Sequence, residues 1–150
     1  MFQFNLVINH APVAKARPRF TRSGVVYSSK ETLAYEKLVK TLAREQMSKL
    51  SLLEPSDDSL EAHLTFYKAM PPSWSNKKKK EKFATGNVSR PDIDNLAKII
   101  LDSLNGIVYV DDAQVYKIFC TKLWAISPAT HVLILGDTGR NRFETIPNYV

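Results

Sequence analysis

A chain of 150 residues that is 44% hydrophobic and 24% charged has the composition of one folded domain over residues 1–150, which excludes disorder as the default state. A single cysteine, Cys120, excludes an internal disulfide and a cysteine-rich zinc cluster. No apolar run approaches the length of a membrane span, about 20 residues. We therefore expect a cytoplasmic protein without membrane contact. The net charge of +6 favours a polyanionic partner over a cationic one.

The N-terminal third predicts a strand, a basic loop and a helix. From Phe2 to Ile8 apolar and polar residues largely alternate, as expected of a half-buried strand. The proline-containing segment 11–24 then predicts a loop. Ser28, three residues before Glu31, matches a capping box, and the apolar spacing that follows predicts a helix over about residues 29–49.

The middle of the chain predicts a second strand and a long basic loop. Alternation from Leu60 to Tyr67 indicates the strand, and residues 71–90 combine prolines, a lysine cluster and Gly86 without apolar periodicity. A loop of this length in a compact domain tends to be functional or mobile. Within it, Trp74 could stack on an unpaired base, but an aromatic anchor that packs the loop down is the more frequent role.

The last part of the chain predicts a helix followed by strands. The apolar spacing of residues 93–104 predicts an amphipathic helix that ends at Asn105-Gly106. Its expected inward stripe consists of Ile93, Leu96, Ala97, Ile100 and Leu104. Residues 115–123 and 131–135 have the composition of strands, whereas the tail over about residues 137–150 receives no assignment. This order of elements predicts an α+β fold in which a mixed β-sheet packs against two main helices.

Basic residues are concentrated in the two predicted loops. Residues 15–22 and 68–90 hold eleven of the 21 lysines and arginines but only one of the 15 acidic residues. We interpret this excess as a surface for a nucleic-acid backbone, although a lysine run is more often a solvated loop. The residues assigned to DNA contacts are Lys15, Arg17, Arg19, Lys77, Lys78, Lys79, Lys80, Lys82 and Arg90.

Acidic residues gather around the helix predicted over residues 93–104. Asp92 and Asp94 lie at its start, where capping and the helix dipole favour carboxylates. Asp94, Lys98 and Asp102 are spaced by four and share one helical face, which a solvent-exposed salt-bridge ladder would also explain. For Asp102, the furthest from the helix start, we keep this structural interpretation.

A second acidic pair, Asp111 and Asp112, follows a short apolar run that can return the chain alongside the helix, although Asp-Asp is also a common turn. Carboxylates about 4 Å apart repel by roughly 4 kcal/mol per pair at an effective dielectric of about 20, and a divalent cation relieves that repulsion. Oxygen ligands select Mg²⁺ or its substitute Mn²⁺, which indicates phosphoryl transfer, with Lys98 adding positive charge near the phosphate.

Two motifs stand close together, PDIDNLAKIILDSLNG and, shortly after it, VDDAQV, and they are preceded by KARPRF and VYSSKETLAYEKLV. In this combination the chain resembles the RusA family of Holliday junction resolvases of phages and prophages. The resemblance extends from Phe2 to about Leu135. It implies a Mg²⁺-dependent homodimer that nicks opposed strands of branched DNA, a four-way junction, in a bacterial or phage-infected cell. The metal ligands that it implies are Asp92, Asp94 and Asp112, with Lys98 as the helix lysine and with Asp111 and Asn95 as second choices.

Two other classes of function stay open. Pro91-Asp92 and Asp112-Ala113-Gln114 loosely imitate the PD-(D/E)xK duplex nucleases, but Gln114 stands where that class has a lysine, and Asp94 has no role in it. A non-enzymatic DNA-binding module would use the aspartates only to cap a helix and to shape a turn. Nicking after addition of Mg²⁺ or Mn²⁺, and a preference for junctions over linear duplex, would separate the three hypotheses.

Overall fold

The computed structural model describes residues 2–15, 19–24, 26–27 and 29–136. The elements in chain order are β1 (Gln3–Ile8), β2 (Arg19–Phe20), β3 (Val26–Tyr27), α1 (Lys30–Lys49), β4 (Leu60–Ala69), α2 (Asn76–Lys82), α3 (Ile93–Leu104), the 3₁₀ turn η1 (Asp112–Gln114), β5 (Val115–Ala125) and β6 (Ala129–Gly136). Among these described residues, no helix is long and apolar enough to cross a membrane. The C-terminal tail from residue 137 lies outside the described residues.

Four strands form one mixed sheet in the order β1-β6-β4-β5. β6 is antiparallel to both β1 and β4, whereas β4 and β5 are parallel. The parallel pair needs a long crossover, and the connection that contains α2 and α3 supplies it. The predicted mixed sheet is therefore confirmed, and its edge strand β5 lies in contact with α3.

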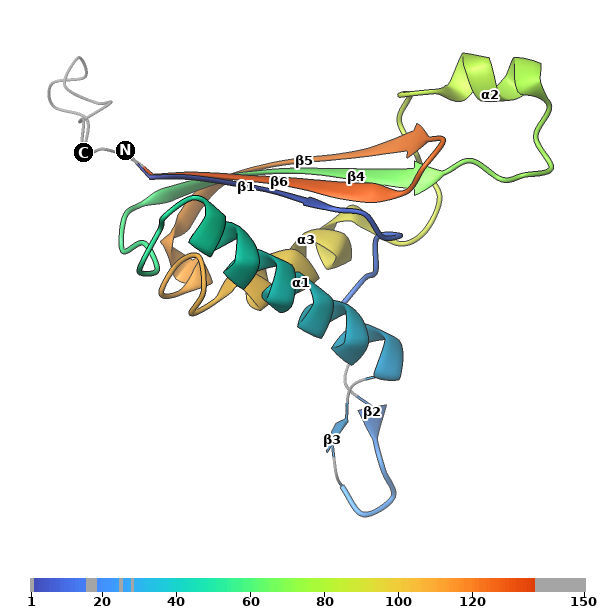
Figure 1. Cartoon of the computed structure of the whole chain (residues 1–150). Coiled ribbons are helices and arrows are strands. Elements are labelled where there is room, and N and C mark those ends of the chain that lie inside the picture. Colours follow the sequence, from blue (N-terminus) through green and yellow to red (C-terminus); the bar gives the residue numbers. More distant parts are fainter. Residues whose placement is uncertain (1, 16–18, 25, 28, 137–150) are drawn as a thin grey trace, which may run out of the picture.

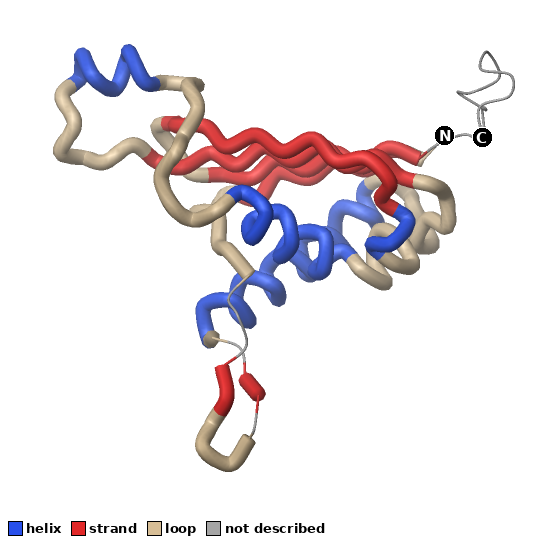
Figure 2. The backbone as a smooth tube through the Cα atoms, turned by 180° about the vertical axis from the view of Figure 1, so that it is seen from behind, coloured by secondary structure: helices blue, strands red, loops and turns tan. Residues whose placement is uncertain are grey.

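Both main helices cover one face of the sheet, and the opposite face carries no described helix (Figures 1 and 2). Alternate residues of β1, namely Phe4, Leu6 and Ile8, are buried in the layer between the sheet and the helices. They belong to one core cluster with the buried residues of α1 and α3. The predicted α+β fold with two main helices is thus confirmed, and this core fixes the position of α3 relative to β5.

Two details of the helix predictions were wrong. α1 is capped by Ser29, whose hydroxyl accepts the Thr32 N–H at 3.2 Å, whereas Ser28 lies outside the described residues. In α3, Ile93 is 37% exposed and Ile99 is fully buried. Because both the sheet and α1 pack against α3, its buried face is wider than the single stripe that the spacing indicated.

The first predicted loop contains regular structure. β2 lies within segment 11–24 and pairs with β3 as a short antiparallel hairpin. The hairpin projects away from the sheet and the two main helices (Figure 1). Two strands of two residues each were too short for alternation to indicate them.

Residues 71–90, which we call the arm, are not the structureless loop that the sequence predicted. The Ser75 hydroxyl accepts the Lys78 N–H at 3.2 Å and caps α2, which extends beyond the end of the sheet (Figure 1). Lysine is a good helix former, and no residue of α2 is buried, so the helix forms without the apolar stripe that periodicity detects. The Trp74 ring packs on the Trp124 ring, with centroids 4.9 Å apart, which agrees with the interpretation of Trp74 as an anchor.

Candidate active site

One cavity between α3 and β5 collects most of the predicted site residues. It has a volume of about 530 Å³ and is called here the acid cavity. Its lining residues are Ile93, Asp94, Ala97, Lys98, Leu101, Asp102, Asp112, Ile118 and Cys120. Asp94, Lys98 and Asp102 come from α3, and Asp112 comes from the η1 turn that precedes β5. Two separate segments therefore bring three carboxylates and one ammonium group to one surface.

Asp92 lies at the N-cap position of α3 but does not cap the helix. Its carboxylate makes no capping hydrogen bond, whereas Ser29 and Ser75 cap α1 and α2 in the usual way. The Asp92 side chain is 61% exposed, and Arg90 Nη1 lies 4.0 Å from its Oδ1. Helix capping, the alternative explanation for Asp92, therefore leaves its carboxylate unused. Asp92 is not among the residues that line the acid cavity.

Asp111 is engaged in the structure of the turn before β5. Its carboxylate accepts the Ala113 N–H at 3.2 Å, and Gln114 Oε1 accepts the Asp111 N–H at 2.8 Å. The Gln114 amide also donates to the carbonyls of Ser56 and Asp58, both at 2.9 Å. Gln114 therefore ties the turn to a distant loop, and this use of its amide counts against the duplex-nuclease interpretation, in which a lysine at this position takes part in catalysis.

Asp112 lines the acid cavity beside the C-terminal end of α3 and is positioned by its backbone. Its N–H donates to Asn105 Oδ1 at 2.7 Å, which connects η1 to the end of α3. Burial raises the pKa of Asp112, and hydrogen bonds to the neighbouring carboxyls of Asp111 and Asp102 raise it further. Such a rise occurs where carboxylates meet without a counter-charge, and a bound cation would reverse it. Asn105, which the sequence indicated only as a helix stop, thus helps to place Asp112.

Asp102 belongs to this acidic group rather than to a salt-bridge ladder. Among the described residues, no ion pair joins Lys98 to Asp94 or Asp102. Asp102 Oδ2 instead lies 3.7 Å from Lys15 Nζ, which also pairs with Glu36. Helical spacing placed Asp102 on the correct face but could not reveal that Asp112 approaches it. The Lys15 ammonium is engaged within the domain, and its assignment to a DNA contact stays a prediction.

Two lysines of the sheet hold segment 89–91, which leads into Asp92. Lys122 of β5 donates to the Ser89 carbonyl and, at 2.8 Å, to the Pro91 carbonyl. Lys68 of β4 donates to the Ser89 hydroxyl at 3.0 Å and to the Arg90 carbonyl at 2.7 Å. Charge-assisted hydrogen bonds to three successive carbonyls fix the path of the chain immediately before the acidic motif. The sequence counted Lys68 only as part of the basic segment 68–90 and gave no signal for Lys122, because both lysines are remote from the motif along the chain.

The donor chemistry of the acid cavity suits a hard divalent ion such as Mg²⁺ or Mn²⁺. Within the described part of the chain, no three His, Cys, Asp or Glu side chains lie close enough together to enclose a metal ion. Asp92 and Asp94 are exposed, so their side chains are free to change rotamer when an ion binds. Lys98 lines the same cavity, whereas Asn95 does not.

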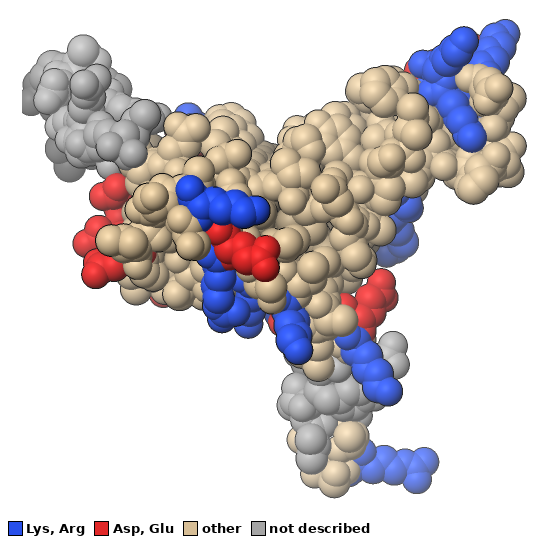
Figure 3. Space-filling view, viewed as in Figure 1, with Lys and Arg blue, Asp and Glu red and all other residues tan. Residues whose placement is uncertain are grey.

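The residues assigned to DNA contacts lie on separate parts of the molecule. Lysine side chains gather over the arm (Figure 3). The lysines of α2 are Lys77, Lys78, Lys79, Lys80 and Lys82. Arg90 is exposed at the end of the arm, the backbone of Arg19 lies in β2, and Arg17 lies outside the described residues. The DNA contacts of these residues stay predictions.

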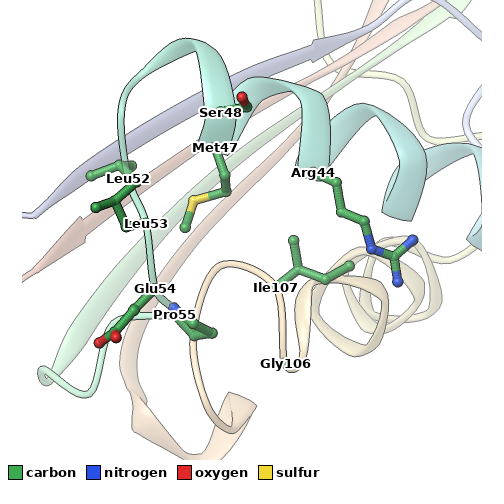
Figure 4. A pocket seen from close by; sticks show the side chains of 9 residues that line it. All are labelled: Arg44, Met47, Ser48, Leu52, Leu53, Glu54, Pro55, Gly106 and Ile107. Atoms are coloured by element: carbon green, nitrogen blue, oxygen red, sulfur yellow. The ribbon is translucent and has the colours of Figure 1, made fainter.

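A further cavity lies at the C-terminal end of α1 (Figure 4). It has a volume of about 390 Å³, and its charged lining residues are Arg44 and Glu54. The other lining residues are Met47, Ser48, Leu52, Leu53, Pro55, Gly106 and Ile107. With one carboxylate and no lysine, this cavity lacks the combination of groups found in the acid cavity.

Comparisons with known proteins identify the kind of chain that carries this site. Residues 9–135 match the family model described as endodeoxyribonuclease RusA. The uncharacterized protein YqaN of Bacillus subtilis (strain 168) is 32% identical over 130 residues, which covers 82% of this chain and 89% of YqaN. The part of the chain matched by the family model includes every residue that lines the acid cavity.

Proposed function

Because the chain belongs to the RusA family of endodeoxyribonucleases, we propose that it resolves four-way DNA junctions by divalent-metal-dependent, paired phosphodiester hydrolysis. The observation that supports this proposal most strongly is the acid cavity, because Asp94, Asp112 and Lys98 all line it. Carboxylates next to one ammonium group can hold a cation together with the phosphate that the cation binds. A module that only bound DNA would have no need to gather like charges in this way.

The residues of the proposed site divide into metal ligands, a phosphate-binding lysine and a supporting asparagine. Asp92, Asp94 and Asp112 would hold Mg²⁺ or Mn²⁺, and Lys98 would bind a phosphate oxygen and offset the negative charge that develops on it. When bound, the divalent ion supplies positive charge to the phosphate oxygens and lowers the pKa of a bound water. Asn105 keeps Asp112 in place through the 2.7 Å bond to its backbone N–H.

The proposed reaction requires two cutting sites, and we assign them to two copies of the chain. Paired incision occurs at symmetric positions of a junction, whereas the described part of one chain has one acid cavity. An isologous homodimer relates its two sites by a two-fold axis that matches the symmetry of the junction. Sedimentation of the protein should therefore give the mass of a dimer, and a monomer that makes paired nicks would contradict this assignment.

Asp94→Asn and Asp112→Asn test the metal ligands. Each substitution removes one negative charge with little change of shape, so Mg²⁺-dependent nicking of a synthetic four-way junction should fall by at least about 100-fold. Junction binding should stay equal or become tighter, because a repulsion between carboxylate and phosphate is removed. Asp57→Asn is the matched control, since Asp57 is an exposed aspartate outside the acid cavity. If either cavity variant nicks at the rate of the control, that ligand is wrongly assigned.

A further inference from the structure

The arm carries a cavity that the proposed chemistry does not use. Its volume of about 500 Å³ falls within the range of about 300–1,000 Å³ that is typical of small-ligand sites. The residues that line this arm cavity are Met70, Asn76, Lys79, Lys80, Phe83 and Ile126. The lining thus combines three apolar side chains with one amide and two ammonium groups, and apolar walls with a few polar groups are typical of sites for flat, partly polar ligands.

Phe83 is the exposed aromatic residue of the arm cavity, and its backbone is held on both sides. Phe83 is 55% exposed. The Phe83 N–H donates to the Lys79 carbonyl at 3.0 Å, and the N–H of the next residue, Ala84, donates to the Trp124 carbonyl at 2.9 Å. Trp74, the other aromatic residue of the arm, is already packed on Trp124. Phe83 is therefore presented to solvent by a fixed backbone, which lowers the ordering cost of binding.

The charge around the arm cavity identifies the kind of partner that fits it. α2 carries five lysines and a single acid, Glu81. A second copy of the arm would bring like charges together, and an uncharged apolar partner would leave these ammonium groups without counter-charges. A nucleic-acid strand satisfies both parts of the lining, because phosphates pair with lysines and base faces stack on aromatic side chains. A paired duplex supplies only the phosphates, because its bases are stacked within the helix.

We propose that the arm cavity binds an unpaired nucleobase of branched DNA, stacked on Phe83, with the adjoining phosphate on Lys79 and Lys80. The inference rests on the proposed function in taking branched DNA as the substrate. β5 and the turn after it connect the two cavities, since Cys120 lines the acid cavity and Ile126 lines the arm cavity. Six residues of extended chain span about 20 Å. At about 3.4 Å of helix axis per nucleotide of a paired strand, the bound base lies about six nucleotides from the phosphate in the acid cavity.

Phe83→Ala tests this proposal in the full chain without divalent metal, so that binding is measured apart from nicking. The probes are a synthetic four-way junction with unpaired bases at its branch point, a single strand and a linear duplex of the same length. One base–aromatic stack corresponds to about 5-fold to 150-fold in affinity. The variant should bind the junction and the single strand more weakly by that factor, and bind the duplex within about twofold of the parent, since a duplex offers no base to stack. Phe83→Trp should restore the affinity for the single strand.

Val88→Ala is the matched control, because Val88 is an apolar arm residue that is 99% exposed and does not line the arm cavity. An equal loss on all three probes, or no loss on the junction and the single strand, would overturn the proposal. A change in the oligomeric state of Phe83→Ala would assign the cavity to a second copy of the chain and would also overturn it. Because these measurements involve no cleavage, a failure of the nicking activity leaves their outcomes unchanged.

A second measurement locates the bound base along the strand. A photoreactive pyrimidine placed at successive positions of the junction should crosslink to the arm most strongly about six nucleotides from the phosphate held in the acid cavity. That phosphate can be located in the metal-free complex by its protection from chemical cleavage. A strongest crosslink to residues outside the arm would contradict the placement of the base on Phe83.

Discussion

Replacing Lys122 by methionine should loosen the segment that leads into the proposed metal site. The Lys122 ammonium donates to the Ser89 carbonyl and, at 2.8 Å, to the Pro91 carbonyl. Methionine retains an unbranched apolar side chain but has no donor, so both carbonyls lose a charged partner. Lys68 still donates to the middle carbonyl at 2.7 Å, so the segment keeps one of its two attachments to the sheet. Asp92, one residue further, should therefore become less well placed rather than lost.

The size of the effect follows from the hydrogen bonds that are removed. A hydrogen bond from a charged group contributes about 1.5–3 kcal/mol. Lys122 is half-buried, so water can replace one of its two bonds, and we expect the free energy of unfolding to fall by about 1.5–3 kcal/mol in total. In the variant, metal binding has to order this segment at the cost of the same free energy. At about 1.4 kcal/mol per factor of ten, the half-saturating Mg²⁺ concentration should then rise by about 10-fold, with an upper limit of about 100-fold.

Urea unfolding and a Mg²⁺ titration of junction nicking measure the two effects separately. The matched control is Lys37→Met, because Lys37 is an exposed lysine of α1 to which the same change can be made. Lys122→Met should unfold at lower urea than the control, require more Mg²⁺ for nicking, and recover most of its rate at high Mg²⁺. An unchanged Mg²⁺ requirement, or unfolding at the same urea concentration as Lys37→Met, would refute the positioning role of Lys122.

Two further predictions concern the charges of the site and of the arm. In chelator at pH 7, Asp112→Asn should melt at a higher temperature than the parent. Because the pKa of Asp112 is raised, the native state keeps this proton to a higher pH than the unfolded chain does. The parent therefore loses stability as the pH rises from the unfolded to the native pKa, and the variant does not. The difference should fade as the pH falls towards the ordinary carboxyl pKa of about 4, and a lower melting temperature at pH 7 would count against it. Replacing Lys77 and Lys82 by glutamine should reduce the slope of log affinity for duplex DNA against log salt by up to about 1.8, since each phosphate contact contributes about 0.9. The same change at Lys37 and Lys49, which are exposed on α1, should leave the slope unaltered, and an equal reduction there would show that only net charge matters.

The sequence predicted those parts of the fold whose burial follows a single period. In β1 every second residue is buried, because one face of this strand packs on the helices. The helix over residues 93–104 has the predicted bounds, because its apolar spacing and its Asn105 stop agree. That Asp94 and Asp112 line one cavity was also predictable in outline, since the short connection from α3 to η1 leaves little room for any arrangement other than a return along the helix.

Features that depend on contacts between distant segments could not be predicted. Helix α2 has no buried residue and therefore no apolar period. Asp102 becomes part of the acid cavity only because η1 approaches the end of α3, through the bond from Asp112 to Asn105. The different uses of the two neighbouring aspartates are equally non-local: Asp111 is engaged by Gln114, whose amide binds a loop more than fifty residues earlier in the chain.

Incision of a synthetic four-way junction as Mg²⁺ is added, with ligation of the products as the readout, shows whether the chain is a junction resolvase. Two sites that hydrolyse symmetric phosphodiester bonds should produce nicked duplexes that a ligase can seal, and chelator should abolish these products. Binding of the junction without incision in either Mg²⁺ or Mn²⁺ would contradict the account, as would equally fast cutting of a linear duplex.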